Sequence, residues 1–281
     1  MINFNGKISP KEDLIINYQN RAFKYGDAIF DTLKYEDGYI PFLEDHYFRL
    51  MSSLRMLRMK IPMNFTLSYY KDEILKTINA NNIEDARIRV TIFRKDGGLY
   101  TPLDNNINFM VEVNKLSLKD LKEYKMELFK DFLVQKGLLS NIKSNNRLIN
   151  VLASVFANEF GFQNCILIND NKNIVEAINA NIFIIKGFNI YTPALEEGCI
   201  NGIIRKKIIE MIEVHKSYTI HKTGISPFEL LKCDEIFITN SIVHIQSVTQ
   251  YKNKIYGNTR TLELMKLFES FTLESENLNS D

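Results

Sequence analysis

Hydrophobic positions in the first half of the chain alternate in some stretches and recur every three or four residues in others. Ala28–Tyr35 alternates, and the turn residues Glu36-Asp37-Gly38 separate it from Tyr39-Ile40, which predicts a β-hairpin. In residues 43–60 the apolar side chains recur at helical spacing. The same criteria predict a second helix at 67–80 and two further strands at 87–93 and 107–113.

The second half of the chain begins after a polar stretch, residues 115–125, that carries no strong strand pattern. Its later pattern predicts strands near 125–133, 165–169, 179–186, 235–239 and 242–248, and helices near 146–160 and 203–215. Strands and helices do not alternate strictly, so two α+β domains fit better than one doubly wound sheet. We expect a small N-terminal domain at 1–115, a joint at 116–124 and a second domain at 125–281.

The composition excludes several classes of function but does not identify the function. The chain carries 35 Lys and Arg against 34 Asp and Glu, whereas nucleic-acid binders usually show a basic excess. The longest apolar runs are too short to span a bilayer, and the first ten residues lack the pattern of a secretory leader. Three cysteines without zinc or disulfide spacing are typical of a reducing cytoplasm, and four scattered histidines argue against a metal site. We therefore expect a cytoplasmic protein without nucleic-acid, membrane or metal partners.

Standard phosphate-loop, dinucleotide and zinc-protease motifs are absent, but five segments occur in an informative order. They are residues 20–32 with 46–50, then Lys143-Ser144-Asn145-Asn146-Arg147-Leu148, and then residues 175–183, 201–205 and 234–241. Together they resemble the fold-type IV pyridoxal-phosphate (PLP) enzymes, the class IV aminotransferases. This group includes branched-chain and D-amino acid aminotransferases and aminodeoxychorismate lyase. The resemblance spans roughly residues 1 to 260, and it implies a small α+β domain, a larger barrel-like α/β domain and a homodimer.

The resemblance assigns the central cofactor contacts to three residues. Lys143 stands where the family has the lysine that binds PLP covalently and later moves a proton, a role that requires surroundings that lower its pKa. Glu176 stands where an acid keeps the pyridine nitrogen protonated, which makes the ring an electron sink. Arg49 matches the arginine that binds the phosphate, a contact that suits a planar guanidinium. Without the motif context, each of the three would be taken for an ordinary solvated side chain.

Five further residues are expected to line the cofactor. Ile203 and Ile204 open a predicted helix whose backbone N–H groups can face an anion, although many aminotransferases have threonine in place of Ile204. Ser241 either offers a hydroxyl to the same phosphate or serves in a turn. Asn181 either contacts the cofactor or holds a turn. Arg147 replaces the tyrosine of branched-chain aminotransferases and matches the lyase pattern K-x-x-N-R-L.

The reaction depends on the residues expected to face the substrate, which are Phe30, Thr32 and Tyr100. D-Amino acid aminotransferases have tyrosine and valine at the first two positions and an R-x-H carboxylate trap that residues 98–101 lack, which argues against that activity. The motifs F-D-T-L, N-G-I-I-R and K-S-N-N-R-L favour aminodeoxychorismate lyase, which releases pyruvate and 4-aminobenzoate for folate synthesis. A branched-chain-type aminotransferase is the alternative, and a non-catalytic PLP-fold binding protein is a further one. The expected substrate is a small molecule, either an amino acid or aminodeoxychorismate.

Overall fold

The computed structural model describes residues 1–118 and 121–277, and the chain divides into two compact units. The first comprises Met1–Leu118 and Lys143–Asn146, and the second comprises Lys119–Ile142 and Arg147–Asp281. Residues 119–120, inside the predicted joint, and 278–281, at the end of the predicted second domain, lie outside the described residues. The segment Lys143–Asn146 thus belongs to the first unit, although the sequence pattern assigns it to the second domain. No helix in the described part of the chain is long and apolar enough to cross a membrane.

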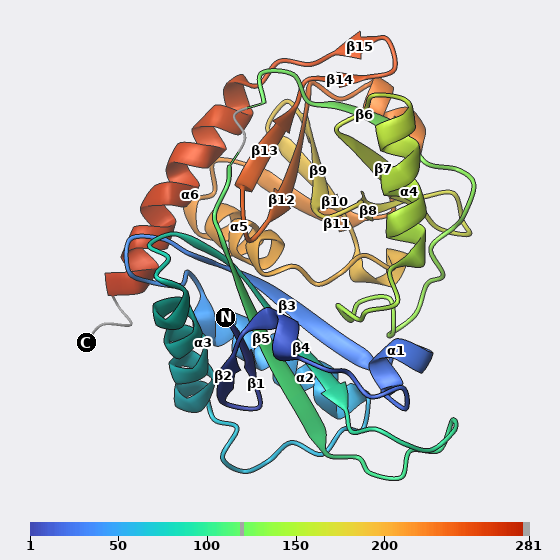
Figure 1. The fold of residues 1–281 in the computed structure, drawn as a ribbon. Coiled ribbons are helices and arrows are strands. Elements are labelled where there is room, and N and C mark those ends of the chain that lie inside the picture. The colour runs from blue at the N-terminus through green and yellow to red at the C-terminus, as the bar shows by residue number, and fades with distance from the viewer. Residues whose placement is uncertain (119–120, 278–281) are drawn as a thin grey trace. The chain divides into compact units, whose positions relative to one another are not determined.

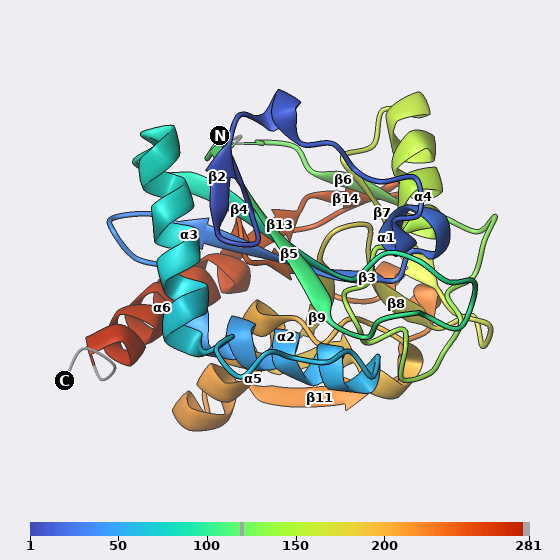
Figure 2. The same ribbon diagram turned by 60° about the horizontal axis from the view of Figure 1, so that its bottom comes forward.

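The first unit is built on a five-stranded antiparallel sheet with the order β2-β1-β5-β4-β3. Its strands are β1 (Ile2–Phe4), β2 (Lys7–Ser9), β3 (Ala28–Tyr35), β4 (Ala86–Arg94) and β5 (Ile107–Lys115). The helices α2 (Leu43–Met56) and α3 (Leu67–Asn81) pack against β3 and β5, and a short helix, α1 (Arg21–Tyr25), precedes β3 (Figures 1 and 2). Ile88, Val90 and Ile92 alternate along β4 and are fully buried, so they supply the core that the two-residue period predicts.

Two elements of this unit differ from the predicted ones. The predicted turn closes, since Glu36 and Tyr39 form an antiparallel bridge with hydrogen bonds of 3.2 and 3.1 Å, but Tyr39-Ile40 does not continue as a second strand. β3 pairs instead along its whole length with β4. β4 is nine residues long and mostly buried, so it offers every residue of β3 a backbone partner. The helix expected at 43–60 ends at Met56, because Arg58 takes a left-handed conformation with φ of 56° and Met59 donates back to the Leu54 carbonyl.

The second unit contains two five-stranded sheets, with the orders β11-β10-β9-β12-β13 and β15-β14-β6-β7-β8. Buried residues of both sheets, such as Met126, Ile166, Ile182 and Ile236, belong to one hydrophobic cluster, so the sheets share a core. The helices α4 (Leu148–Glu159) and α6 (Thr259–Asn277) flank these strands (Figure 1), and α5 (Ile203–His215) contacts β11 and β12. The strands are β6 (Lys125–Leu128), β7 (Asn164–Ile168), β8 (Ile174–Ala177), β9 (Asn181–Lys186), β10 (Asn189–Pro193), β11 (Thr219–Thr223), β12 (Glu235–Asn240), β13 (His244–Val248), β14 (Gln250–Tyr251) and β15 (Lys254–Ile255).

Several elements of the second unit have no counterpart among the predicted ones, and for two of these, β11 and α6, burial explains why. β11 is a polar strand at the edge of its sheet and pairs in parallel with β10, so it shows no apolar alternation. In α6 the buried residues Thr261, Leu264, Phe268 and Thr272 do recur at helical spacing. Two of these four side chains are polar, so the hydrophobic pattern is weak there.

Candidate active site

Lys143 lies on a short extended segment that pairs with β3. The Lys143 carbonyl accepts from the Phe30 N–H at 2.9 Å, and the Asn145 N–H donates to the Ala28 carbonyl at 3.0 Å. Gly26, whose φ is 63°, permits this approach, because a Cβ there would lie 2.0 Å from Oδ1 of Asn146. The glycine before β3 therefore admits the lysine segment to the outer edge of the sheet.

Phe30 brings two cationic groups to one face of that sheet. The Nζ of Lys143 lies 4.5 Å from the centroid of the Phe30 ring, and the Cζ of Arg89 lies 3.7 Å from the same centroid. Thr32 is the register partner of Arg89, so it shares this face. Burial lowers the pKa of Arg89, which also donates to the Thr91 hydroxyl at 3.2 Å. A lysine and an arginine over one aromatic ring form a cationic patch suited to an anionic substrate group.

Arg89 is a site residue that the hydrophobic pattern alone does not single out. It lies on β4 between the fully buried Ile88 and Val90 and is itself half-buried. Its Nη2 also donates to Oδ1 of Asn145 at 3.2 Å, two residues beyond Lys143. Arg89 is one of three arginines on β4, with Arg87 and Arg94, so the sequence does not distinguish it until the neighbouring strand is known.

Arg49 belongs to a buried ion cluster on the other face of β3. Oδ1 of Asp31 accepts from Nη2 of Arg49 at 2.5 Å and from Nδ1 of His46 at 3.0 Å. Burial alone would raise the pKa of Asp31, but Arg49, His46 and the charge of Lys143 hold this pKa far below its usual range. Asp31 therefore stays ionised and fixes the orientation of Arg49 on α2.

Tyr100 lies in a loop that a buried arginine holds. Arg21 is 4% exposed and donates to the carbonyls of Gly97, Leu99 and Tyr100 at 3.1, 2.6 and 3.2 Å. Its Nε pairs with Asp27 at 2.9 Å. The Tyr100 side chain is itself 89% exposed, and its ring centroid lies 5.7 Å from that of Tyr25. The structure thus fixes the backbone of this loop more firmly than the tyrosine ring.

In the second unit, Glu176 is a buried acid on β8. Its Oε2 accepts from the Ile200 N–H at 2.8 Å, and its Oε1 lies 3.8 Å from Nη1 of Arg147. Arg147 also donates to the Ile142 carbonyl at 2.7 Å. Burial lowers the pKa of Arg147, while the charge of Glu176 raises it. Two residues that the resemblance assigns to the cofactor are therefore ion-pair neighbours.

Asn181 packs against the first turn of α5. Its Nδ2 donates to the Ile200 carbonyl at 2.9 Å, and its Oδ1 would lie 2.0 Å from a Cβ on Gly202, the residue that caps the helix. The side chains of Ile203 and Ile204 are 4% and 2% exposed. Only their backbone N–H groups can therefore face an anion at this helix N-terminus.

The end of β12 carries the last predicted residue, Ser241. It begins a turn in which Oδ1 of Asn240 accepts two backbone N–H groups at 2.9 and 3.1 Å. Thr239, opposite Asn181 in register, is 1% exposed, and within residues 1–118 and 121–277 its Oγ1 has no hydrogen-bond partner. A buried hydroxyl without a partner is what a polar ligand would satisfy, so this strand end fits an oxygen-rich cofactor. The sequence motif points to Ser241 but gives no sign of Thr239.

Known proteins are similar to this chain along most of its length. The family model described as Amino-transferase class IV matches residues 28–251. Aminodeoxychorismate lyase of Bacillus subtilis is 30% identical over 272 residues, which cover 92% of this chain and 89% of the relative. A Methanocaldococcus jannaschii protein, provisionally named a branched-chain-amino-acid aminotransferase, is 27% identical over 286 residues, which cover 94% of this chain and 92% of the relative.

Solved structures share the architecture. The branched-chain amino acid aminotransferase of Escherichia coli matches with a TM-score of 0.86 at 21% identity, covering 96% of this chain and 93% of that one. The 4-amino-4-deoxychorismate lyase of Pseudomonas aeruginosa matches with a TM-score of 0.85 at 20% identity, covering 96% and 98%. The predicted fold class, a two-domain α+β fold of fold-type IV, is therefore confirmed. A transaminase and a lyase match almost equally well, so the fold does not separate the two reactions.

Proposed function

The chain belongs to the class IV aminotransferase family, and we propose that within it the protein is an aminodeoxychorismate lyase, which releases pyruvate and 4-aminobenzoate. Enzymes of this family use PLP, and the chain is accordingly a PLP-dependent transaminase or lyase. The observation that carries the lyase proposal is Arg147, which follows Lys143 in the pattern K-x-x-N-R-L. Its guanidinium lies 3.8 Å from Glu176, at the position where branched-chain aminotransferases have a tyrosine. The 30% identity to the Bacillus subtilis lyase supports the same choice.

The residues present fit the cofactor. Bound PLP supplies an electron sink for carbanion chemistry at the substrate Cα. Glu176, buried and oriented by the Ile200 N–H, suits the pyridine nitrogen, and the start of α5, where Gly202 provides no side chain to cap the helix, suits the phosphate. We assign to the cofactor the residues that the motifs indicate: Arg49, Lys143, Arg147, Glu176, Asn181, Ile203, Ile204 and Ser241.

The substrate is proposed to bind on the face of β3 that carries Phe30. Lys143 Nζ would remove the substrate Cα proton as a general base, and it lies on this face, 4.5 Å from the centroid of the Phe30 ring. Arg89 would bind a substrate carboxylate, because a guanidinium pairs with a carboxylate through two parallel hydrogen bonds. Thr32 extends the same face, and Tyr100 is proposed as a further substrate-facing residue whose loop Arg21 holds.

Product analysis tests this proposal. With aminodeoxychorismate as substrate, the PLP-loaded protein should release 4-aminobenzoate and pyruvate in equal amounts. Lys143→Ala should abolish both products. Lys136→Ala is the matched control and should retain them, because Lys136 pairs with Asp170 and belongs to none of the motifs. Turnover of leucine with 2-oxoglutarate, without any 4-aminobenzoate, would overturn the lyase proposal.

A branched-chain-type aminotransferase is the second candidate. The 27% identity to the Methanocaldococcus jannaschii relative favours it. D-Alanine aminotransferases are also among the relatives, but residues 98–101 lack their R-x-H carboxylate trap. If neither lyase nor transaminase activity is found while the protein retains PLP, the chain would be a binding protein of this fold without turnover.

We also propose that the protein is a cytoplasmic homodimer. On α4 the apolar side chains of Leu148, Val151 and Val155 share one helix face and are 71%, 55% and 49% exposed. A second copy of the chain would remove this stripe from water. All three cysteines are free and buried, which suits a reducing compartment. Sedimentation equilibrium should give twice the mass of one chain, and Val151→Glu should shift the protein toward the monomer.

A further inference from the structure

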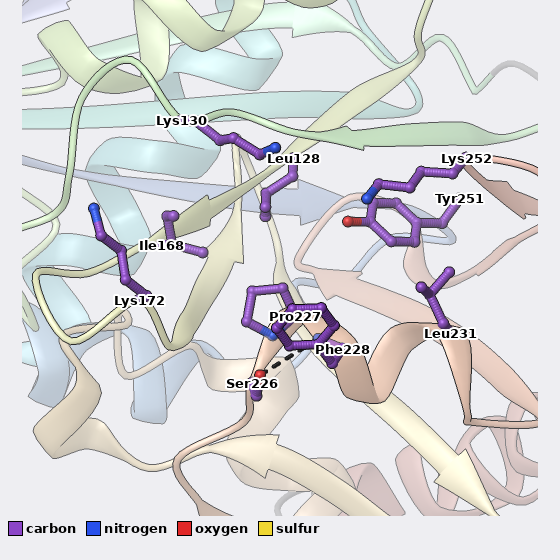
Figure 3. A pocket seen from close by; sticks show the side chains of 10 residues that line it. All are labelled: Leu128, Lys130, Ile168, Lys172, Ser226, Pro227, Phe228, Leu231, Tyr251 and Lys252. Carbon is purple, nitrogen blue, oxygen red and sulfur yellow. Dashed lines mark hydrogen bonds between the residues drawn. The ribbon is translucent and has the colours of Figure 1, made fainter.

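The second unit contains a cavity of about 330 Å³ that none of the assigned cofactor or substrate residues lines. It opens among β6, β7, β14 and the short helix η3 (Pro227–Leu231) (Figure 3). Its inner surface is apolar, since Leu128, Ile168 and Tyr251 are 8%, 4% and 1% exposed. An apolar cavity of about 150 Å³ is enough to hold a benzene molecule. The space therefore admits one substituted aromatic ring.

The outer wall of this cavity exposes an aromatic ring to solvent. Phe228 lines the cavity and is 73% exposed. The backbone N–H of Phe228 donates to Oγ of Ser226 at 3.4 Å, the bond drawn in Figure 3. The Ser226 side chain thereby caps η3. A planar ligand ring bound against Phe228 would cover part of this apolar surface.

Three lysines surround the apolar space. Lys130, Lys172 and Lys252 come from separate segments, and Figure 3 shows them at separate points around the cavity. Within residues 1–118 and 121–277, none of these three amines has a carboxylate at ion-pair distance. Asp170, two residues before Lys172, and Glu229, next to Phe228, pair with other lysines instead. The cavity thus combines an apolar interior with an excess of positive charge.

We propose that this cavity is a binding site for a small aromatic carboxylate. The ring would occupy the apolar interior, and the carboxylate would lie among the lysine amines, which act as mobile point charges. The site does not depend on which reaction the enzyme catalyses. If the lyase proposal holds, its product 4-aminobenzoate belongs to this ligand class.

Calorimetric titration of the PLP-loaded protein tests the site with benzoate, using benzamide as a neutral probe of the same shape. Benzoate should bind saturably and more tightly than benzamide, and added salt should weaken it. Replacing each of the three lysines by alanine should raise the Kd for benzoate about two- to fivefold, as expected for partly exposed charge pairs. Phe228→Ala should also raise the Kd. Lys232→Ala is the matched control and should leave the Kd unchanged, because Lys232 already pairs with Glu229 at 3.2 Å.

Three results would overturn the proposal. One is the absence of saturable benzoate binding, and another is equal affinity for benzoate and benzamide. The third is unchanged benzoate affinity in the triple variant Lys130→Ala/Lys172→Ala/Lys252→Ala, which would mean that benzoate binds elsewhere, for example at Arg89. Each result is a binding measurement, so a failure here is distinguishable from a failure of the lyase assay.

Discussion

Gly202 offers a stringent test of how the first turn of α5 is positioned. Its backbone angles, φ of −69° and ψ of 141°, are open to any residue, so only space opposes a larger side chain. In Gly202→Ala the new Cβ would lie 2.0 Å from Oδ1 of Asn181. Asn181 is 6% exposed and holds the Ile200 carbonyl at 2.9 Å, so it cannot turn away without losing that bond.

The cost of Gly202→Ala follows from these contacts. Overpacking a tight site costs about 1 to 3 kcal/mol, and a lost hydrogen bond costs about 1 kcal/mol. We expect a loss of about 2 to 3 kcal/mol in the free energy of unfolding. PLP affinity should fall about tenfold, a change of about 1.4 kcal/mol, because the same shift moves the N–H groups of Ile203 and Ile204.

Urea unfolding of the cofactor-free protein and titration with PLP measure the two effects. Gly257→Ala is the matched control, since a Cβ there meets nothing within 4 Å, and it should change stability by less than about 0.5 kcal/mol. In the double variant Gly202→Ala/Asn181→Ala the clash is removed, so its loss should be smaller than the sum of the single losses by about 1 kcal/mol or more. The reasoning fails if Gly202→Ala behaves like Gly257→Ala or if the two changes are additive.

Three further predictions concern the surrounding structure. Asp31→Asn should lower the free energy of unfolding, measured with urea at pH 7, by about 3 kcal/mol, because it breaks a buried ion cluster. Because folding lowers the pKa of Asp31, the stability difference between wild type and variant should narrow as the pH falls below about 4. A stability difference that does not change with pH would contradict this. Arg21→Lys keeps the positive charge but loses the guanidinium that binds three backbone carbonyls. Amide hydrogen exchange in residues 97–100 should therefore become faster, and KM should rise more than kcat falls. Unchanged exchange would refute the anchoring role of Arg21. Native protein at pH 8 should not react with Ellman's reagent until it unfolds, because burial raises the thiol pKa to about 11 or about 12 for Cys165, Cys199 and Cys233.

Elements with a regular apolar pattern could be predicted from the sequence. The helix expected at 203–215 coincides with α5, because Gly202 precedes a row of buried isoleucines at helical spacing. The strands expected at 87–93 and 107–113 lie within β4 and β5. The apolar spacing within each of these segments determines its structure, so that spacing was enough to predict it.

The placement of the site residues has no such local cause. Lys143 lies in a polar segment without strand periodicity, and its pairing with β3 depends on a glycine more than a hundred residues earlier, Gly26. The buried Arg21 donates to carbonyl groups of a loop that is distant in sequence. Arg89 is a site candidate only because it and Lys143 both contact the Phe30 ring. Motif resemblance found Lys143 and Phe30 but not Arg89, whose place beside them is set by tertiary contacts.

The position of the covalently bound cofactor tests the central claim most directly. Borohydride treatment of the PLP-loaded protein should fix the cofactor to its lysine, and peptide mass spectrometry then identifies that residue. We predict a single phosphopyridoxyl group on Lys143 and none on the Lys143→Ala protein. A group on another lysine, or one that persists in Lys143→Ala, would contradict the assignment of the site.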